Sequence, residues 1–318
     1  MRSTRIDNIG GAMSSDERIY TNFSRLSLLA KKGRGLSWRP PYSKISPLSG
    51  LQKSSQRGRG LDFVELRHYF DGDDVRCIDW RVTQRTGQAF IRLYSEEKDK
   101  SAVLLIDLRS SMFFASDGVM KSVLASELAA IIAGRIQVEG DRIGALMLTD
   151  THIESHSAMR GEKSLLSLLE KVTQLGGRLP AQGQIEPPSL DDALHLLCQQ
   201  KIKESQIFII SDFVDFIDKT SRALLSQLAR HNNIIGLRVS DPLEDELPNS
   251  NVLMGDGLLQ LEINGDNGQL RQRYNRFTIE HNQGVENGFL SIGQPYLALT
   301  THKESWQQLF SMSSARRR

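Results

Sequence analysis

Short apolar runs alternate with longer periodic segments along most of this chain of 318 residues. Four runs are typical of strands covered on both faces: SAVLLIDL from residue 101, RIGALML from 142, QIFIIS from 206 and NIIGLRVS from 233. Segments with apolar residues at helical spacing lie between and around them, at about residues 119–136, 161–172, 190–200 and 219–230. Strands that alternate with helices predict an α/β fold with a doubly wound, mostly parallel sheet.

The flanking residues follow other patterns. Ser14 and Glu17 form a capping-box pattern, and the apolar stripe after them predicts a helix that ends at Gly33. Two strand-like segments, LDFVELRHY and QAFIRLYSEE, enclose DVRCIDWRVTQRTG, and the tail holds strand-like pieces and a last helix at ESWQQLFSM. We therefore expect four parts: a basic helix and linker at 1–60, a hairpin-like module at 61–100, the α/β domain at 101–245, and a C-terminal extension at 246–318.

Composition narrows the class of protein. The chain holds no apolar run of about eighteen residues, so we expect no membrane insertion. Its first residues show no signal-peptide pattern, so we expect a cytoplasmic protein. The two cysteines, Cys77 and Cys198, lie far apart without metal-ligand spacing, and we expect both to be reduced.

Charge is unevenly distributed. Residues 1–60 carry 12 Lys and Arg against 3 Asp and Glu, a net charge of +9, whereas the rest carries 28 against 35, a net charge of −7. Such an arm suits nucleic acid or an acidic protein face, or it lies on its own acidic body. Aromatic residues are not interleaved with its basic residues, so nucleic acid is not the expected partner and stays an alternative.

Polar residues at the predicted strand ends are the first candidates for a site. In open α/β sheets ligands bind beyond the carboxyl ends of the strands. The first of these strands ends in Asp107, Arg109 and Ser111, and the third ends in Ser211 and Asp212. Carboxylate and hydroxyl oxygens in one crevice are suited to a divalent cation such as Mg²⁺.

Two groups of residues carry a resemblance to known families. The strand-end pattern Asp107-x-Arg109-x-Ser111 with a later Asp212 resembles the D-x-S-x-S metal-ion-dependent adhesion site of von Willebrand factor A domains. The stretch DFVELRHYFDGDDVRCIDWRVTQRTG resembles the signature of the bacterial domain of unknown function 58 family. That resemblance implies a von Willebrand A-like domain, a MoxR-type AAA+ ATPase as partner, and an adaptor or co-chaperone role for client proteins without catalytic activity.

The adhesion-site pattern is broken at its middle position, where Arg109 stands in place of Ser. The loop threonine of the pattern falls near Pro188, with only Ser189 beside it. A guanidinium satisfies carboxylates by bidentate hydrogen bonds and repels a divalent cation. We therefore expect Arg109 to replace the metal and to pair with Asp107 or Asp212, with no cofactor. If Mg²⁺ did bind, its ligands would be Asp107, Ser111 and Asp212.

The stretch YFDGDDVRCIDW at residues 69–80 suggests a metal site, a catalytic carboxylate pair or an ion-pair network. Four arginines within and around this stretch alternate with acids, which favours a partly buried ion-pair network anchored by Trp80. We expect Arg76, Asp79 and Trp80 to form part of a partner-binding face. An equal alternative is that the network only fastens the module to the α/β body.

Other chemistry finds less support. His152 and His156 would lie roughly 13 Å apart in an extended chain, too far to share an ion. A phosphate-binding P-loop and a nucleophile elbow are absent from the sequence.

The expected function is a non-enzymatic protein-binding adaptor acting through Asp107, Arg109, Ser111 and Asp212. The alternatives are a metal-dependent phosphohydrolase using Asp107 and Asp212, and nucleic-acid binding through the basic arm.

Overall fold

The computed structural model describes residues 17–36, 61–96, 100–177, 187–216, 219–248, 252–255, 260–263 and 267–314. The chain divides into a small unit, Tyr42–Lys100, and a larger unit, Met1–Pro41 with Ser101–Arg318. The basic arm predicted at residues 1–60 is therefore described only over 17–36.

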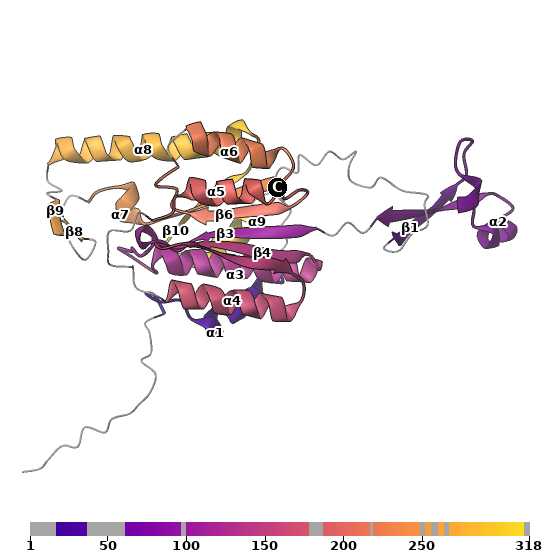
Figure 1. Cartoon of the computed structure of the whole chain (residues 1–318), viewed down its shortest axis with the longest axis horizontal. Coiled ribbons are helices and arrows are strands. Elements are labelled where there is room, and N and C mark those ends of the chain that lie inside the picture. Colours follow the sequence, from indigo (N-terminus) through magenta and orange to yellow (C-terminus); the bar gives the residue numbers. More distant parts are fainter. Residues whose placement is uncertain are drawn as a thin grey trace, which may run out of the picture. The chain divides into compact units, whose positions relative to one another are not determined.

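A six-stranded sheet forms the centre of the larger unit (Figure 1). Its strand order is β10-β7-β6-β3-β4-β5, and every pair of neighbours is parallel except β4 and β5. The mostly parallel α/β sheet expected from the sequence is confirmed. The strands are β3 (Ser101–Asp107), β4 (Arg142–Leu148), β5 (Ile153–Met159), β6 (Gln206–Ser211), β7 (Asn233–Ser240) and β10 (Tyr296–Thr300).

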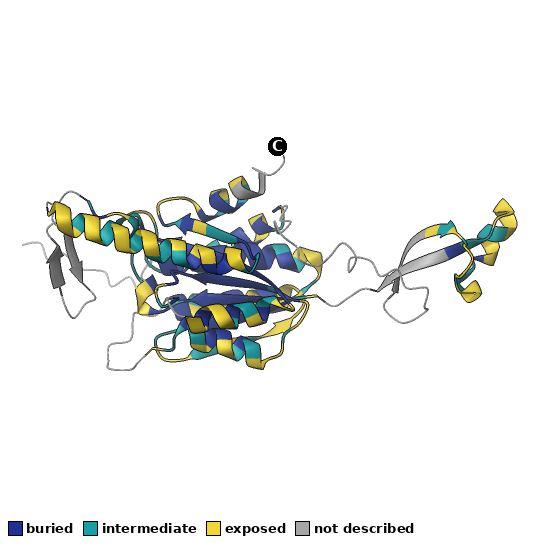
Figure 2. Ribbon diagram, turned by 90° about the horizontal axis from the view of Figure 1, so that it is seen from above, coloured by how far each residue is buried: buried dark blue, intermediate teal, exposed yellow. Residues whose placement is uncertain are grey.

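Helices cover both faces of this sheet (Figure 1). On one face lie α3 (Lys121–Glu139) and α4 (Glu162–Gly176), and α1 (Phe23–Gly33) and α9 (Ser305–Ser314) pack against α3. The other face packs against α5 (Leu190–Gln199), α6 (Lys219–Ala229) and α8 (Gly268–Ser291). Strands β3, β4, β6 and β7 are buried between these two layers (Figure 2), which explains why their sequences are continuous apolar runs. The outer strands β5 and β10 are mostly half-buried or exposed.

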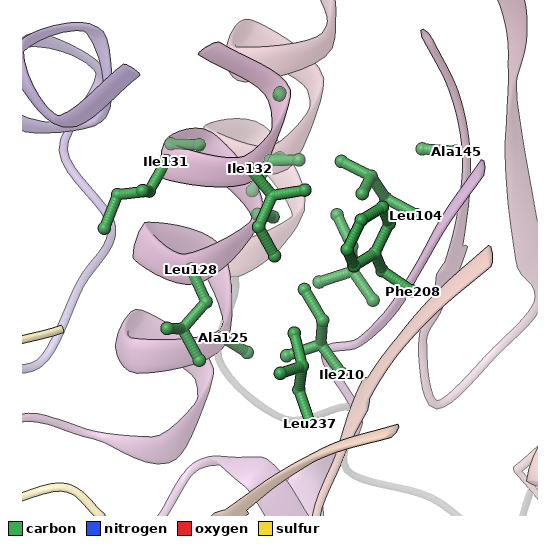
Figure 3. Close-up of a cluster of buried hydrophobic side chains, with 14 of the residues drawn as sticks. Leu104, Ala125, Leu128, Ile131, Ile132, Ala145, Phe208, Ile210 and Leu237 are labelled. Carbon is green, nitrogen blue, oxygen red and sulfur yellow. The ribbon is translucent and has the colours of Figure 1, made fainter. Parts of the chain in front are cut away.

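The core between α3 and the sheet is the largest apolar cluster of the described chain. Leu128 and Ile132 of α3 face Leu104, Phe208 and Ile210 of the sheet (Figure 3). Fifteen of the 19 residues of α3 are buried, because other helices cover the side of α3 that faces away from the sheet. A helix enclosed in this way has no need of a polar face.

The first helix begins later than the sequence pattern predicts. Asn22 is its N-cap and accepts hydrogen bonds from the backbone N–H groups of Ser24 and Arg25, whereas the predicted cap at Ser14 lies outside the described residues. The end at Gly33 is confirmed. At the crossing with α3, a Cβ atom on Gly134 would lie 1.9 Å from the carbonyl oxygen of Ala30. The two backbones therefore meet closely, and α1 is an integral layer of the larger unit.

The C-terminal part contains a helix that the sequence pattern did not predict. Helix α8 is 24 residues long and follows α7 (Pro242–Asp245) and the hairpin of β8 (Val252–Gly255) and β9 (Gln260–Ile263). Its exposed apolar residues, among them Phe277 and Ile279, obscure the spacing of apolar residues that would identify a helix in the sequence. The tail also completes the main sheet, because β10 pairs with β7. No helix in the described part of the chain is long and apolar enough to cross a membrane.

The small unit is a two-stranded antiparallel hairpin with a short helical insertion. Strands β1 (Leu61–His68) and β2 (Phe90–Glu96) pair, and between them lie the 3-10 turn η1 (Val75–Cys77) and helix α2 (Trp80–Thr86). The two strands and the enclosed segment agree with the sequence prediction. Ile91 is the one apolar side chain that is buried among those the structure describes in this unit.

Candidate functional site

The carboxyl ends of β3 and β6 lie side by side in the sheet and form the edge predicted to carry a site. The chain leaves β3 toward α3 on one face and leaves β6 toward α6 on the other. Strands whose connections diverge in this way leave a crevice between them. Asp107 ends β3 and Ser211 ends β6, and both are fully buried. The Ser211 hydroxyl donates a 2.7 Å hydrogen bond to Asp107.

Arg109 lies in this crevice and is held by two carboxylates. Its Nε and Nη2 donate to the two oxygens of Asp107 at 3.0 and 2.7 Å. On the other side, Nη1 and Nη2 donate to the two oxygens of Asp215 at 2.7 and 3.1 Å. The expected pair with Asp107 is therefore present, but the second carboxylate is that of Asp215 and not that of Asp212.

The guanidinium has no N–H group left for another ligand. Its remaining Nη1 donor reaches the backbone carbonyl of Pro188 at 3.3 Å, so all five guanidinium donors are used. The loop expected to supply a threonine thus contributes a carbonyl oxygen instead. Asp215 is tied to the same loop, because it accepts a 2.8 Å hydrogen bond from the backbone N–H of Leu190.

Asp212 belongs to a second ion-pair cluster beside the first. The ammonium group of Lys121, at the start of α3, lies between the carboxylates of Asp212 and Glu244. The Lys121 side chain is almost fully buried. Of the two carboxylates expected to pair with Arg109, Asp107 does so, whereas Asp212 is paired with Lys121.

The loop after β6 separates the two carboxylates by an unusual turn. Phe213 has φ of +58°, in the left-handed region that bulky side chains rarely adopt. Its ring packs against Phe216 and Phe289, and its backbone N–H bonds the Ser211 hydroxyl at 3.0 Å. These contacts offset a strain of about 1–3 kcal/mol. Because of this turn, Asp212 pairs with Lys121 and Asp215 pairs with Arg109. Val214, which lies between the two aspartates in the sequence, is exposed.

The local electrostatics follow from burial and pairing. Burial raises the pKa of Asp107 because it removes water from the carboxylate, and the charge of Arg109 opposes this effect. Burial acts in the same direction on Asp215, but hydrogen bonds and charge from Arg109 outweigh it and lower the pKa of Asp215. Desolvation acts to lower the pKa of Lys121, and the charges of Asp212 and Glu244 raise it overall. Both cations are therefore charged at neutral pH.

The residues of the edge do not fit a divalent cation. Asp107 already accepts four hydrogen bonds, three from Arg109 and one from Ser211, which fills its lone pairs. A metal would have to displace the guanidinium from both of its carboxylates. Within the described ranges, no group of three His, Cys, Asp or Glu side chains is arranged to hold a metal ion.

Other polar residues near this edge are exposed or half-buried. Ser111 lies in the 3-10 turn η2 (Ser110–Met112) and is exposed at the same edge. Asp150, after β4, accepts a 2.8 Å hydrogen bond from the backbone N–H of Ser110 and so orders this turn. His152 pairs with Glu154 rather than with His156.

Sequence reasoning missed Asp215, Lys121 and Glu244. A lone lysine at the start of an otherwise apolar helix was a usable signal, since a buried lysine requires a carboxylate. For Asp215, the signal was a second acid three residues after Asp212 in a strand-end loop. Neither signal names the partner, because the paired residues lie about a hundred positions apart.

In the small unit, one ion pair of the predicted network lies between described residues. Arg67 forms a bidentate pair with Asp73, at 2.9 and 2.7 Å, and also lies over the ring of Phe70. Arg76 is exposed, and Trp80 is 64% exposed, so Trp80 does not anchor a buried network. The cause is the size of the unit, which has too little core to enclose an indole ring.

Asp79 has a structural position within that unit. It is buried, and its side chain accepts hydrogen bonds from the backbone N–H groups of Arg81 and Val82 at 3.0 and 3.3 Å. Asp79 is therefore the N-cap of α2. Of the three partner-binding residues expected here, Arg76 and Trp80 are exposed, whereas Asp79 orders the helix that carries Trp80.

Comparisons with known proteins agree on a family and on a fold. A family model described as "Protein of unknown function DUF58" matches residues 65–284. Uncharacterized proteins of Mycobacterium tuberculosis and Mycobacterium bovis are each 28% identical over 267 residues, which is 82% of this chain and 81% of the relative.

Among solved structures, BatB from Bacteroides thetaiotaomicron is 12% identical with a TM-score of 0.41, over 68% of this chain and 97% of that chain. The SpRpn10 VWA domain has the same identity and TM-score, over 68% of this chain and 96% of that chain. Both resemble this chain in fold alone.

Proposed function

The chain belongs to the DUF58 family of proteins of unknown function, and for this member we propose that the strand-end edge binds another protein without a metal ion. The partner that we propose is a MoxR-type AAA+ ATPase, with which the chain acts as an adaptor for client proteins. We propose no catalytic step.

One observation carries the proposal: the Arg109 guanidinium is bound on both sides by carboxylates. The Asp107–Arg109–Asp215 cluster joins the end of β3 to the loop after β6 and, through Pro188, to the start of α5. A fixed internal cation ties these loops together in the way a metal ion would. The edge is therefore pre-ordered, which reduces the entropy lost on binding a protein.

The exposed residues above this cluster supply the contact surface. Val214 is 55% exposed, and Ser110 and Ser111 are exposed next to the same crevice. An apolar side chain held outward by a rigid turn is suited to a small pocket on a partner. Arg109 and Asp107 support this surface from below rather than contact the partner.

The alternative of a metal-dependent phosphohydrolase finds no support in this arrangement. It required Asp107 and Asp212 to share a metal, whereas each is paired with a different buried cation. A hydrolase of this kind needs carboxylate oxygens that are free to bind the metal ion.

A pair of valine variants tests the proposal. Val214→Glu places a charge in the proposed contact. Val138→Glu makes the same change in the last turn of α3, at the opposite end of the strands, and Val138 is 53% exposed against 55% for Val214. We expect the full chain to bind a purified MoxR-type AAA+ ATPase, and Val214→Glu to weaken this binding about tenfold or more. Val138→Glu is expected to leave it unchanged. Equal affinities of the two variants would contradict the proposal, and so would no binding of the ATPase with or without ATP.

A further inference from the structure

Helix α2 of the small unit has four exposed residues whose spacing places them on one side of the helix: Trp80, Arg81, Gln84 and Arg85. Residues four apart are neighbours on a helix, so Trp80 lies beside Gln84 and Arg81 lies beside Arg85. Val82 and Thr83 face the other way, toward the hairpin. We call the four exposed residues the α2 face.

This short helix is held in place at both ends. Asp79 caps its start, and Gly87 ends it with φ of +73°, a conformation suited to glycine. The backbone N–H of Asp79 bonds the carbonyl of Phe90 at 2.8 Å, and the Thr83 hydroxyl accepts from the N–H of Phe90 at 3.2 Å. The α2 face is thus an ordered surface before any partner arrives.

Trp80 contributes little to the packing of its own unit. An exposed indole offers a partner a large apolar area, because a buried tryptophan removes about 150–250 Å² from water. Tryptophan and arginine are also the residue types enriched where single side chains dominate binding. The composition of the α2 face is that of a binding surface rather than of an ordinary solvated helix.

The two positive charges of the α2 face, on Arg81 and Arg85, favour an acidic partner. Arg81 and Arg85 repel each other at this spacing, which costs a short helix part of its stability. In the described part of the chain neither forms an ion pair, whereas the nearby Arg67 is neutralised by Asp73. Carboxylates on a partner would relieve this repulsion and add charge-assisted hydrogen bonds.

We propose that the α2 face binds an acidic protein surface that offers an apolar pocket to Trp80 and carboxylates to Arg81 and Arg85. Protein is favoured over nucleic acid because residues 66–91 hold four arginines and four aspartates. Their formal charges cancel, whereas binding to a phosphate backbone relies on a net positive surface. The inference stands apart from the strand-end edge and does not depend on its partner.

The test uses the full chain and short synthetic peptides in which leucine and phenylalanine are flanked by glutamates. Peptides with lysine in place of glutamate, and single-stranded RNA, are the comparison probes. We expect selective binding of the glutamate peptides, with affinity reduced about tenfold or more by Trp80→Ala and by Arg81→Gln with Arg85→Gln. Added salt is expected to weaken the binding.

Matched controls lie on α8, which is exposed in the larger unit. Phe277→Ala removes an aromatic ring that is 66% exposed, and Arg273→Gln with Arg276→Gln removes two exposed charges. Both are expected to bind as the wild type does, and so is Val214→Glu, which separates this test from that of the strand-end edge. Equal binding of glutamate and lysine peptides, equal losses in the α8 controls, or RNA binding that the α2 variants abolish would each overturn the proposal.

Discussion

The ammonium group of Lys121 donates a 2.9 Å hydrogen bond to Asp212, and the two side chains are only 1% and 4% exposed. This pair connects the first residue of α3 to the end of β6 across the interior of the molecule. Together with the Arg109 cluster it places two internal cations beneath the strand-end edge.

Removing the ammonium group leaves buried carboxylates without a counter-charge. We expect Lys121→Met to lower the free energy of unfolding by about 3–5 kcal/mol in urea titrations. The control is Lys171→Met, which breaks the half-exposed pair with Glu154 and is expected to cost about 0–1 kcal/mol. Similar losses in the two variants would show that burial does not decide the contribution of Lys121.

The crossing of α1 and α3 depends on the absence of a side chain at Gly134. Gly134→Ala is expected to force the helices apart and to destabilise the protein by at least about 1–3 kcal/mol. Gly284→Ala, in α8, has 3.6 Å of clearance and is expected to stabilise its helix by about 0.5–1 kcal/mol. Thermal melting should show a lower melting temperature for Gly134→Ala and a higher one for Gly284→Ala. A Gly134→Ala variant as stable as the wild type would refute the close packing.

Asp241 gives the stability a predictable dependence on pH. Burial acts to raise its pKa, but hydrogen bonds from Ser116, Leu243 and Thr301 outweigh burial and lower it. A lowered native pKa means that the carboxylate stabilises the fold fully above the unfolded value of about 3.9 and loses this contribution as pH falls through the native pKa.

The Asp241→Asn variant isolates this contribution. We expect it to be less stable than the wild type by about 1–3 kcal/mol at neutral pH, because charge-assisted hydrogen bonds are lost. The difference should shrink as the pH is lowered below about 4. A difference that stays constant in urea unfolding from neutral to acidic pH would contradict the assignment.

The capping role of Asp79 makes a local prediction. Asp79→Ala is expected to cost about 0.5–2 kcal/mol and to accelerate hydrogen exchange at the amides of Arg81 and Val82. Asp71→Ala, at an exposed position of the same unit, should leave exchange in α2 unchanged. Unchanged exchange in Asp79→Ala would argue against the cap.

Patterns that are local in the sequence predicted much of this molecule. The buried strands were visible because parallel strands covered on both faces need continuous apolar runs. The Asp107–Arg109 pair was predictable because its members lie two residues apart at a strand end. The start of α1 at Asn22 differs because a local capping pattern at Ser14 is only one of several competing starts.

Features that depend on distant residues were not predictable from the same patterns. Arg109 pairs with Asp215 and not with Asp212 because of the turn at Phe213. The spacing of apolar and polar residues does not predict this turn. Trp80 was expected to anchor a partly buried ion-pair network, yet it is 64% exposed in this two-stranded unit. Helix α8 was not predicted because its exposed apolar residues obscure the pattern formed by the buried residues Val285 and Phe289.

The central claim is that Arg109 occupies the place of a cation and leaves Asp107 no free lone pair. Calorimetric titration of the full chain with Mg²⁺ and Mn²⁺ tests it most directly. The account predicts no stoichiometric binding of either ion by the wild type. Tight one-to-one binding that is lost in Asp107→Ala would contradict it.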